Sequence, residues 1–246
     1  MIRLAAVLLL MCVAGFAHAG WGRISKDEIR LDGEIGRDSY REYMRVAEGG
    51  FSTVSLNSGG GLPLVALNIA EDLVLRQVEI VVDGVCMSAC ANYLAVSGRE
   101  LAVRCDSVLA WHGTLGSIAD EKIKMKTSGV PDELIDVYAA WLGDFQVRED
   151  RFFKIAGVNR EILNDSVVAT AEVSAGLRPS FSFDDVSGEY SFTTVAPIWI
   201  PDVSTLRSYG INVSSECGCW TDEEIKESMA KHGIGVPFTS KPVRDK

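Results

Sequence analysis

Hydrophobic positions in the first half of the chain switch repeatedly between two periods. Short apolar runs typical of strands are separated by stretches in which apolar residues recur every three or four positions, as in helices. The pattern predicts strands at 52–57, 79–83 and 108–112 and helices at 64–74 and 89–97. Because strand and helix alternate with short connections, we expect an α/β fold with one parallel sheet and right-handed βαβ crossovers. Ligands of such sheets bind beyond the carboxyl ends of the strands.

The second half of the chain has three further patterned regions. Apolar residues recur at helical spacing over 134–145, which predicts an amphipathic helix that begins near Pro131 and packs in the core or against another subunit. Residues 166–201 are rich in Ser, Val and Phe and are interpreted as a β-rich insertion. A capping box at 221–224 predicts a last helix, and the tail over 236–246 is expected to be loose.

The first nineteen residues have a separate character. A short positive start, an apolar run over 4–16 and the small-x-small ending Ala17-His18-Ala19 predict a secretory signal peptide that is cleaved after Ala19. An uncleaved N-terminal anchor is the alternative. No later stretch reaches the roughly 18 to 20 apolar residues of a spanning helix. We therefore expect a periplasmic or secreted protein with a single α/β domain over 20–235 and no membrane span in the mature chain.

Composition and charge exclude several classes of function. With 47% apolar residues the chain can form a core, and its 24 basic and 34 acidic residues give a net charge of -10. This charge disfavours binding to nucleic acid and to anionic lipid, since both need basic surface. The sequence has no phosphate-binding loop of the Gly-x4-Gly-Lys-[Ser/Thr] type. Two histidines in the mature chain make a histidine-rich metal site implausible, so we predict no metal and no cofactor.

A serine, a glycine loop and a histidine are predicted to meet at one edge of the sheet. Ser88 lies between a strand and a helix, where free N–H groups favour developing negative charge. The N–H groups of Ala89 and of Gly61, in the loop 58–61, are candidate oxyanion donors. His112 ends a strand at the same edge and is the candidate base.

The cysteines leave several interpretations open. Removal of residues 1–19 leaves five of them, an odd number, in a compartment that favours disulfides. Cys86 and Cys90 can form a short-loop bridge around Ser88, and Cys105 can pair with Cys217 or Cys219. A redox enzyme is the sharper alternative, but the chain lacks a Cys-x-x-Cys motif.

Taken in order, these motifs resemble the proteolytic subunit of Clp protease within the Clp/crotonase superfamily. The resemblance is closer to exported Clp-like proteins of bacteria that carry Cys-x-Ser-Ala-Cys around the serine. It covers about 29–112 well and 157–165 and 206–211 more loosely, with glycine at 59 where the family loop carries proline. The residues that carry it are Asn57-Ser58-Gly59-Gly60-Gly61, Ser88 between small residues, Gly98-Arg99 and Trp111-His112.

The resemblance implies a Clp/crotonase fold and a set of roles. It makes Ser88 the nucleophile and His112 the general base, with Gly61 and Ala89 as oxyanion amides. It places the acidic residue of the triad at Asp165, with the alternatives Asp144 and Asp150.

Three functions remain as hypotheses. The first is an exported serine hydrolase, a peptidase that uses no ATP, acts on peptide or protein substrates and assembles as a homo-oligomer through the helix that follows the base. The second is a catalytically inactive binding or assembly protein of the same fold. The third uses a Ser-Lys dyad, as related exported peptidases do, with a base among Lys122, Lys124 and Lys126; their alternation with apolar residues is more typical of a solvated helix face.

Overall fold

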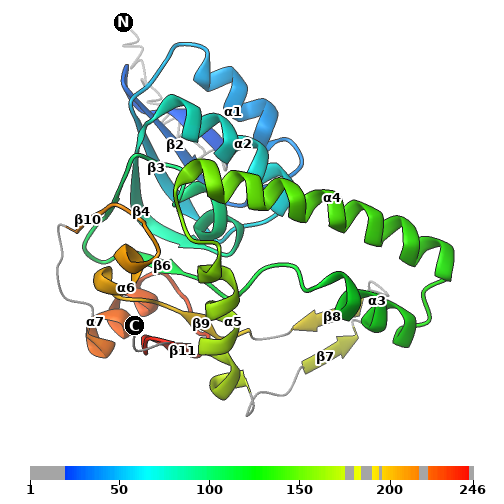
Figure 1. Cartoon of the computed structure of the whole chain (residues 1–246). Helices are drawn as coiled ribbons and strands as arrows, with labels where there is room; N and C mark the ends of the chain where they lie inside the picture. Colours follow the sequence, from blue (N-terminus) through cyan, green and yellow to red (C-terminus); the bar gives the residue numbers. More distant parts are fainter. Residues whose placement is uncertain (1–19, 175–179, 184–189, 194–195, 216–220, 244–246) are drawn as a thin grey trace, which may run out of the picture.

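A mostly parallel sheet forms the centre of the molecule (Figure 1). The computed structural model describes residues 20–174, 180–183, 190–193, 196–215 and 221–243. The strand order is β1-β2-β3-β4-β5-β10, with β6 beside β4, and only the β1–β2 pair is antiparallel within this sheet. The strands are β1 (Gly20–Arg23), β2 (Glu28–Asp32), β3 (Thr53–Ser58), β4 (Glu79–Met87), β5 (Glu100–Val103), β6 (Val108–Ala110) and β10 (Val213–Ser215). The predicted α/β class with a parallel sheet is confirmed.

On the side away from β3, the long strand β4 pairs first with β5 and then with β6. Its first half, 79–82, pairs with β5, and its second half, 85–87, pairs with β6. This change of partner brings β6 alongside the last residues of β4, just before the chain turns at Ser88. The ends of β4 and β6 therefore lie side by side at the carboxyl edge of the sheet.

Helices pack on the sheet and extend from it (Figure 1). α1 (Ser39–Ala47), α2 (Pro63–Arg76) and the proximal part of α4 (Asp132–Ala156) lie side by side, and a short π-helix, η1 (Cys90–Leu94), contacts α2 and β4. α2 begins with proline at its first position, as expected for the helix after the glycine loop. The remaining helices are α3 (Ile118–Thr127), α5 (Glu161–Ser174), α6 (Val203–Ser208) and α7 (Asp222–Lys231).

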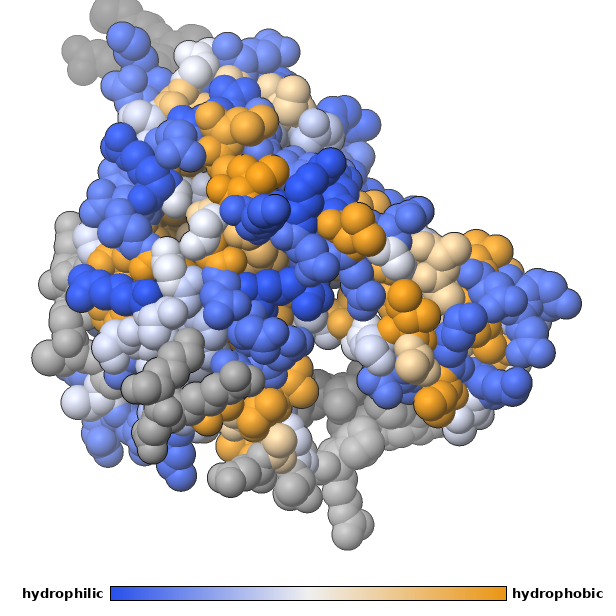
Figure 2. Space-filling view, viewed as in Figure 1, coloured by the Kyte–Doolittle hydropathy of each residue, from blue (hydrophilic) through white to orange (hydrophobic). Residues whose placement is uncertain are grey.

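The helix α4 buries in the core only part of the apolar face that the sequence predicts. It begins after Pro131, as predicted, but its N-terminal part projects from the body with α3 beside it (Figure 1). Leu134 and Val137 are 57% and 68% exposed, and apolar side chains are visible along this projecting end (Figure 2). Only part of the predicted apolar face, including Leu142 and Phe145, is buried in the core. Among the described helices none is long and apolar enough to cross a membrane.

The region expected to be a β-rich insertion is helical at its start. α5 continues through residues 166–174, and short strands β7 (Ser180–Phe183), β8 (Tyr190–Thr193) and β9 (Ile198–Trp199) follow. The hydroxyls of Ser166 and Thr170 donate to helix carbonyls three and four residues earlier, at 2.7 and 2.9 Å. Those bonds satisfy polar side chains within a buried helix face, so a serine-rich composition does not exclude a helix here.

The C-terminal segment is also more ordered than the loose tail expected from 236. β11 (Phe238–Thr239) pairs in parallel with β9, and the indole Nε1 of Trp199 donates to the carbonyl of Lys241 at 3.0 Å. Before it, α7 has the predicted capping box between Thr221 and Glu224. The segment thus adds a second strand, β11, beside the short strand β9.

Candidate functional site

Ser88 lies at a strained turn between β4 and η1. Its φ is +56°, a left-handed conformation that is uncommon for residues other than glycine and costs on the order of 1 kcal/mol. The Ser88 carbonyl accepts the backbone N–H of Asn92 at 2.8 Å, which closes the first turn of the helix. A serine on a sharp strand-to-helix turn presents its hydroxyl at the edge of the sheet, as nucleophiles of α/β hydrolases do.

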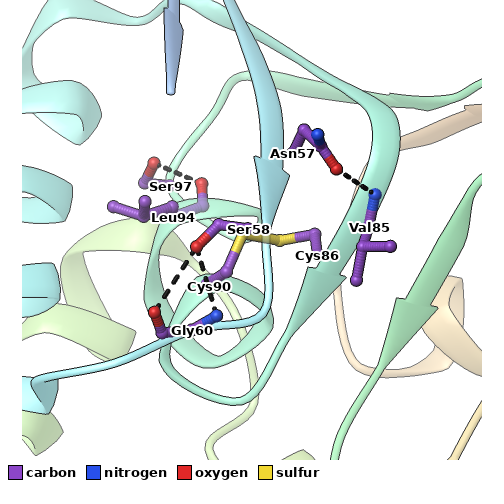
Figure 3. The surroundings of a disulfide bond; sticks show 8 residues. All are labelled: Asn57, Ser58, Gly60, Val85, Cys86, Cys90, Leu94 and Ser97. Carbon is purple, nitrogen blue, oxygen red and sulfur yellow. Dashed lines mark hydrogen bonds between the residues drawn. A yellow bond between two sulfur atoms is a disulfide. The ribbon is translucent and has the colours of Figure 1, made fainter. Parts of the chain in front are cut away.

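A disulfide spans this turn (Figure 3). It joins Cys86 and Cys90, whose Cα atoms lie 5.3 Å apart, and both side chains are fully buried. The bridge lies beside Ser58 of β3, which pairs with Cys86 in the sheet (Figure 3). The predicted short-loop disulfide is therefore confirmed.

The remaining cysteine pairing stays a prediction. Cys105 is disulfide-bonded too. Its two predicted partners, Cys217 and Cys219, lie outside the described residues.

The glycine loop contacts the serine turn directly. A methyl group at Gly60, where φ is +103°, would lie 2.7 Å from the Ser88 Cβ and 3.1 Å from the Ala89 nitrogen. Only glycine allows so close an approach of the two segments. Ser58 Oγ accepts the Gly60 N–H at 3.1 Å and so holds the loop in place (Figure 3).

The Gly61 amide is oriented by its neighbours. Ile35 donates its N–H to the Gly60 carbonyl at 2.8 Å and accepts the Leu62 N–H at 2.9 Å, which forms a parallel bridge between Ile35 and Gly61. In such a bridge the N–H of the middle residue is directed away from the partner strand. The Gly61 N–H therefore faces the β4 side, where the Ser88 turn lies, as an oxyanion donor requires.

The structure brings His112 to the same edge without a hydrogen bond to Ser88. The register between β4 and β6 pairs Met87 with Ala110, so Ser88 and His112 follow the ends of two adjacent strands. The His112 side chain is exposed. Within the described residues neither His112 nor Ser88 Oγ makes a side-chain hydrogen bond.

Asp165 is buried on a helix that packs against the residue after His112. It lies on α5, is 1% exposed, and its Oδ2 accepts the hydroxyl of Tyr209 at 2.6 Å. A methyl group at Gly113, the residue after His112, would lie 2.7 Å from Val167 of the same helix. The two alternative acids, Asp144 and Asp150, are exposed on α4, and Asp150 pairs with Arg160 at 3.0 Å.

The three candidate lysines form a solvated face of α3. Lys122 pairs with Asp136 at 2.9 Å, Lys124 with Glu121 at 2.7 Å and Lys126 with Asp132 at 3.9 Å. The hydrogen bond to Glu121 raises the pKa of Lys124, the opposite of what a lysine base needs.

Two polar residues beside the site were missed by the sequence interpretation. Asn92 and Glu149 are 4% and 1% exposed, and both hydrogen-bond to groups near His112. For Asn92 the available signal was a polar residue within an apolar helical stretch, because such a residue is rarely buried without a partner. Glu149 stands between charged residues, so no such signal was available for it.

Other possible sites lie elsewhere or are absent from the described chain. A cavity of about 460 Å³ lies between α5, α7 and the C-terminal segment, and neither Ser88 nor His112 lines it. The described residues contain no group of three or more His, Cys, Asp or Glu side chains able to hold a metal ion.

Comparison of the chain with models of protein families finds no match, and comparison with curated proteins finds no significant one.

Proposed function

We propose that this chain is an exported serine hydrolase of the Clp/crotonase fold, specifically a peptidase that uses no ATP. The observation that carries the proposal is the left-handed Ser88 turn packed against Gly60. A strained serine, a glycine loop with an outward amide and a histidine just beyond the neighbouring strand support acyl transfer as the chemistry of this site.

The proposed reaction passes through an acyl-enzyme. Ser88 Oγ attacks a substrate carbonyl while His112 takes the hydroxyl proton, and the N–H groups of Gly61 and Ala89 stabilise the oxyanion. His112 then returns the proton to the leaving amine or alcohol. Water, activated by the same imidazole, attacks the acyl group and releases Ser88. Asp165 is the proposed residue that orients His112.

The Cys86–Cys90 disulfide is compatible with an oxidising compartment, in agreement with export after removal of residues 1–19. The exposed apolar residues on the projecting part of α4 support a homo-oligomer assembled through this helix. The proposed protein needs no metal and no cofactor, and it acts on peptide or protein substrates.

A second candidate function is a binding or assembly protein that has lost turnover. The observation that favours it is the exposed His112, which makes no hydrogen bond to Ser88 in the described chain. A base must come within about 2.6 to 3.2 Å of the nucleophile during reaction, although this contact is often longer without substrate.

Covalent labelling with a fluorophosphonate probe separates the two candidates. The purified mature protein would be labelled and mapped by intact mass and peptide mass spectrometry, with heat-denatured protein and Ser88→Ala as controls. Labelling at Ser88 only in folded wild-type protein supports the hydrolase. If neither oxidised nor reduced protein is labelled, the binding function is favoured instead.

A further inference from the structure

Asn92 connects the nucleophile turn to the loop that follows His112. Its backbone N–H donates to the Ser88 carbonyl at 2.8 Å, and its side-chain Nδ2 donates to the Gly113 carbonyl at 2.9 Å. Asn92 is thus hydrogen-bonded both to Ser88 and to Gly113, the residue after His112.

Tyr93, the residue after Asn92 in η1, is linked through Glu149 to Thr114, the residue after Gly113 in the loop. The Tyr93 hydroxyl donates to Glu149 Oε1 at 2.6 Å, and the Thr114 hydroxyl donates to the same oxygen at 3.2 Å. Glu149 comes from α4, and its other oxygen accepts Arg160 Nε at 2.9 Å. The carboxylate is therefore paired with a cation although it is 1% exposed, which makes its burial tolerable.

The Asn92 side chain gives no net gain in the free energy of folding. The side chain is 4% exposed among apolar neighbours, and its Oδ1 has no hydrogen-bond partner within the described residues. A buried acceptor without a partner costs about 1–3 kcal/mol, which offsets the net gain of about 1 kcal/mol from the bond to Gly113. An apolar side chain would avoid this cost. What the asparagine adds is a fixed distance between the turn and the loop.

We infer that Asn92 and Tyr93 are positioning residues that hold the His112 loop against the Ser88 turn, Asn92 directly and Tyr93 through Glu149. The inference rests on the proposed hydrolase function. Its physical basis is that proton transfer from Ser88 depends steeply on where the imidazole lies, so that about 1 Å of displacement can slow a reaction by about a hundredfold.

The test compares two variants with matched controls. Asn92→Leu removes the donor to Gly113, and Tyr93→Phe removes the hydroxyl but keeps the ring that packs on Phe145 and Phe152. Ser97→Ala removes a buried hydroxyl whose bond stays local, to the Leu94 carbonyl. Tyr43→Phe removes a buried hydroxyl bonded to Asp72, far along the chain from the site.

Three quantities are measured on each protein: the rate of fluorophosphonate labelling at Ser88 across pH 5 to 9, amide hydrogen exchange of residues 112–116, and Tm. We expect labelling to slow about tenfold or more in Asn92→Leu and severalfold in Tyr93→Phe. We also expect faster exchange of the loop and a weaker rise of the labelling rate over the same pH range. The controls should label within about twofold of wild type.

Wild-type labelling rates and pH profiles in both variants would overturn the inference while leaving the proposed function intact. If Asn92→Leu does not fold, Tyr93→Phe decides by the same criteria. A wild-type protein that does not label at Ser88 would overturn the proposed function, and the inference with it.

Discussion

The disulfide around Ser88 should contribute about 2 kcal/mol to folding. Cys86 and Cys90 are four residues apart, and the loop-entropy relation for a closed loop of about five residues gives about 2 kcal/mol at 25 °C. For a chain of this length, 1 kcal/mol shifts Tm by about 2–4 °C. Cys86→Ala/Cys90→Ala should therefore lower Tm by about 4–8 °C from the lost cross-link alone.

The double variant also loses two buried sulfurs, and a mutant cycle separates this packing loss from the cross-link. Each single variant, Cys86→Ala or Cys90→Ala, already removes the whole cross-link, so the cross-link loss is counted twice when the singles are added. We expect the sum of the single losses to exceed the double loss by about 2 kcal/mol in urea unfolding at fixed pH.

The same bridge should also hold the catalytic turn. Ser88 is strained at φ +56°, and a turn without its cross-link can relax toward ordinary backbone angles. The double variant should therefore label more slowly at Ser88 than wild type. Additive single variants, or a double variant with wild-type stability and labelling rate, would refute this reasoning.

Three further predictions concern the glycine loop, the Ser88 turn and the buried Tyr93. Gly60→Ala should lose Ser88 labelling and stability because its methyl group would lie 2.7 Å from the Met87 carbonyl and from the Ser88 Cβ, whereas Gly59→Ala, with open space around it, should behave as wild type in both assays. In urea unfolding, Ser88→Gly should have a free energy of unfolding about 0.5–1 kcal/mol higher than Ser88→Ala, because glycine tolerates a positive φ. Equal free energies would argue against strain at this position. Burial, followed by the neighbouring carboxylate, raises the pKa of Tyr93, so the unfolded state loses its tyrosine proton first and stability should fall as pH rises above about 10. Tyr93→Phe should reduce that slope by about 0.8 kcal/mol per pH unit on average in urea unfolding between pH 9.5 and 11, and an unchanged slope would contradict the burial of its hydroxyl.

The parts of the site that were predictable are encoded locally. The strand ending at 57, the glycines after it and the proline that begins α2 all lie within a few residues of one another, as do the strand before Ser88 and the small residues after it. Parallel strands place their carboxyl ends at one edge, so the meeting of the loop, the serine and the histidine follows from local pattern and topology.

The parts that were missed depend on tertiary contact. Asn92 and Glu149 are 57 positions apart in the chain, and only folding brings them to neighbouring residues of one loop, Asn92 to Gly113 and Glu149 to Thr114. The helical start of the expected β-rich segment has a different, local cause, because the hydroxyls of buried Ser166 and Thr170 bond to carbonyls of their own helix. Composition alone cannot distinguish these arrangements.

On the proposed mechanism His112 is the base, and two other candidate bases of the described chain already have partners. Lys124 is held by Glu121, and His232 lies against the carbonyl of Asp106 at 2.8 Å. His112 is exposed, so water solvates its imidazole until a substrate covers it. On the proposed mechanism, removal of that water lowers the local dielectric and favours the hydrogen bond that Ser88 must make to His112 during reaction. On the proposed mechanism, a substrate that spans the glycine loop and His112 completes the site, which favours extended peptides over small esters.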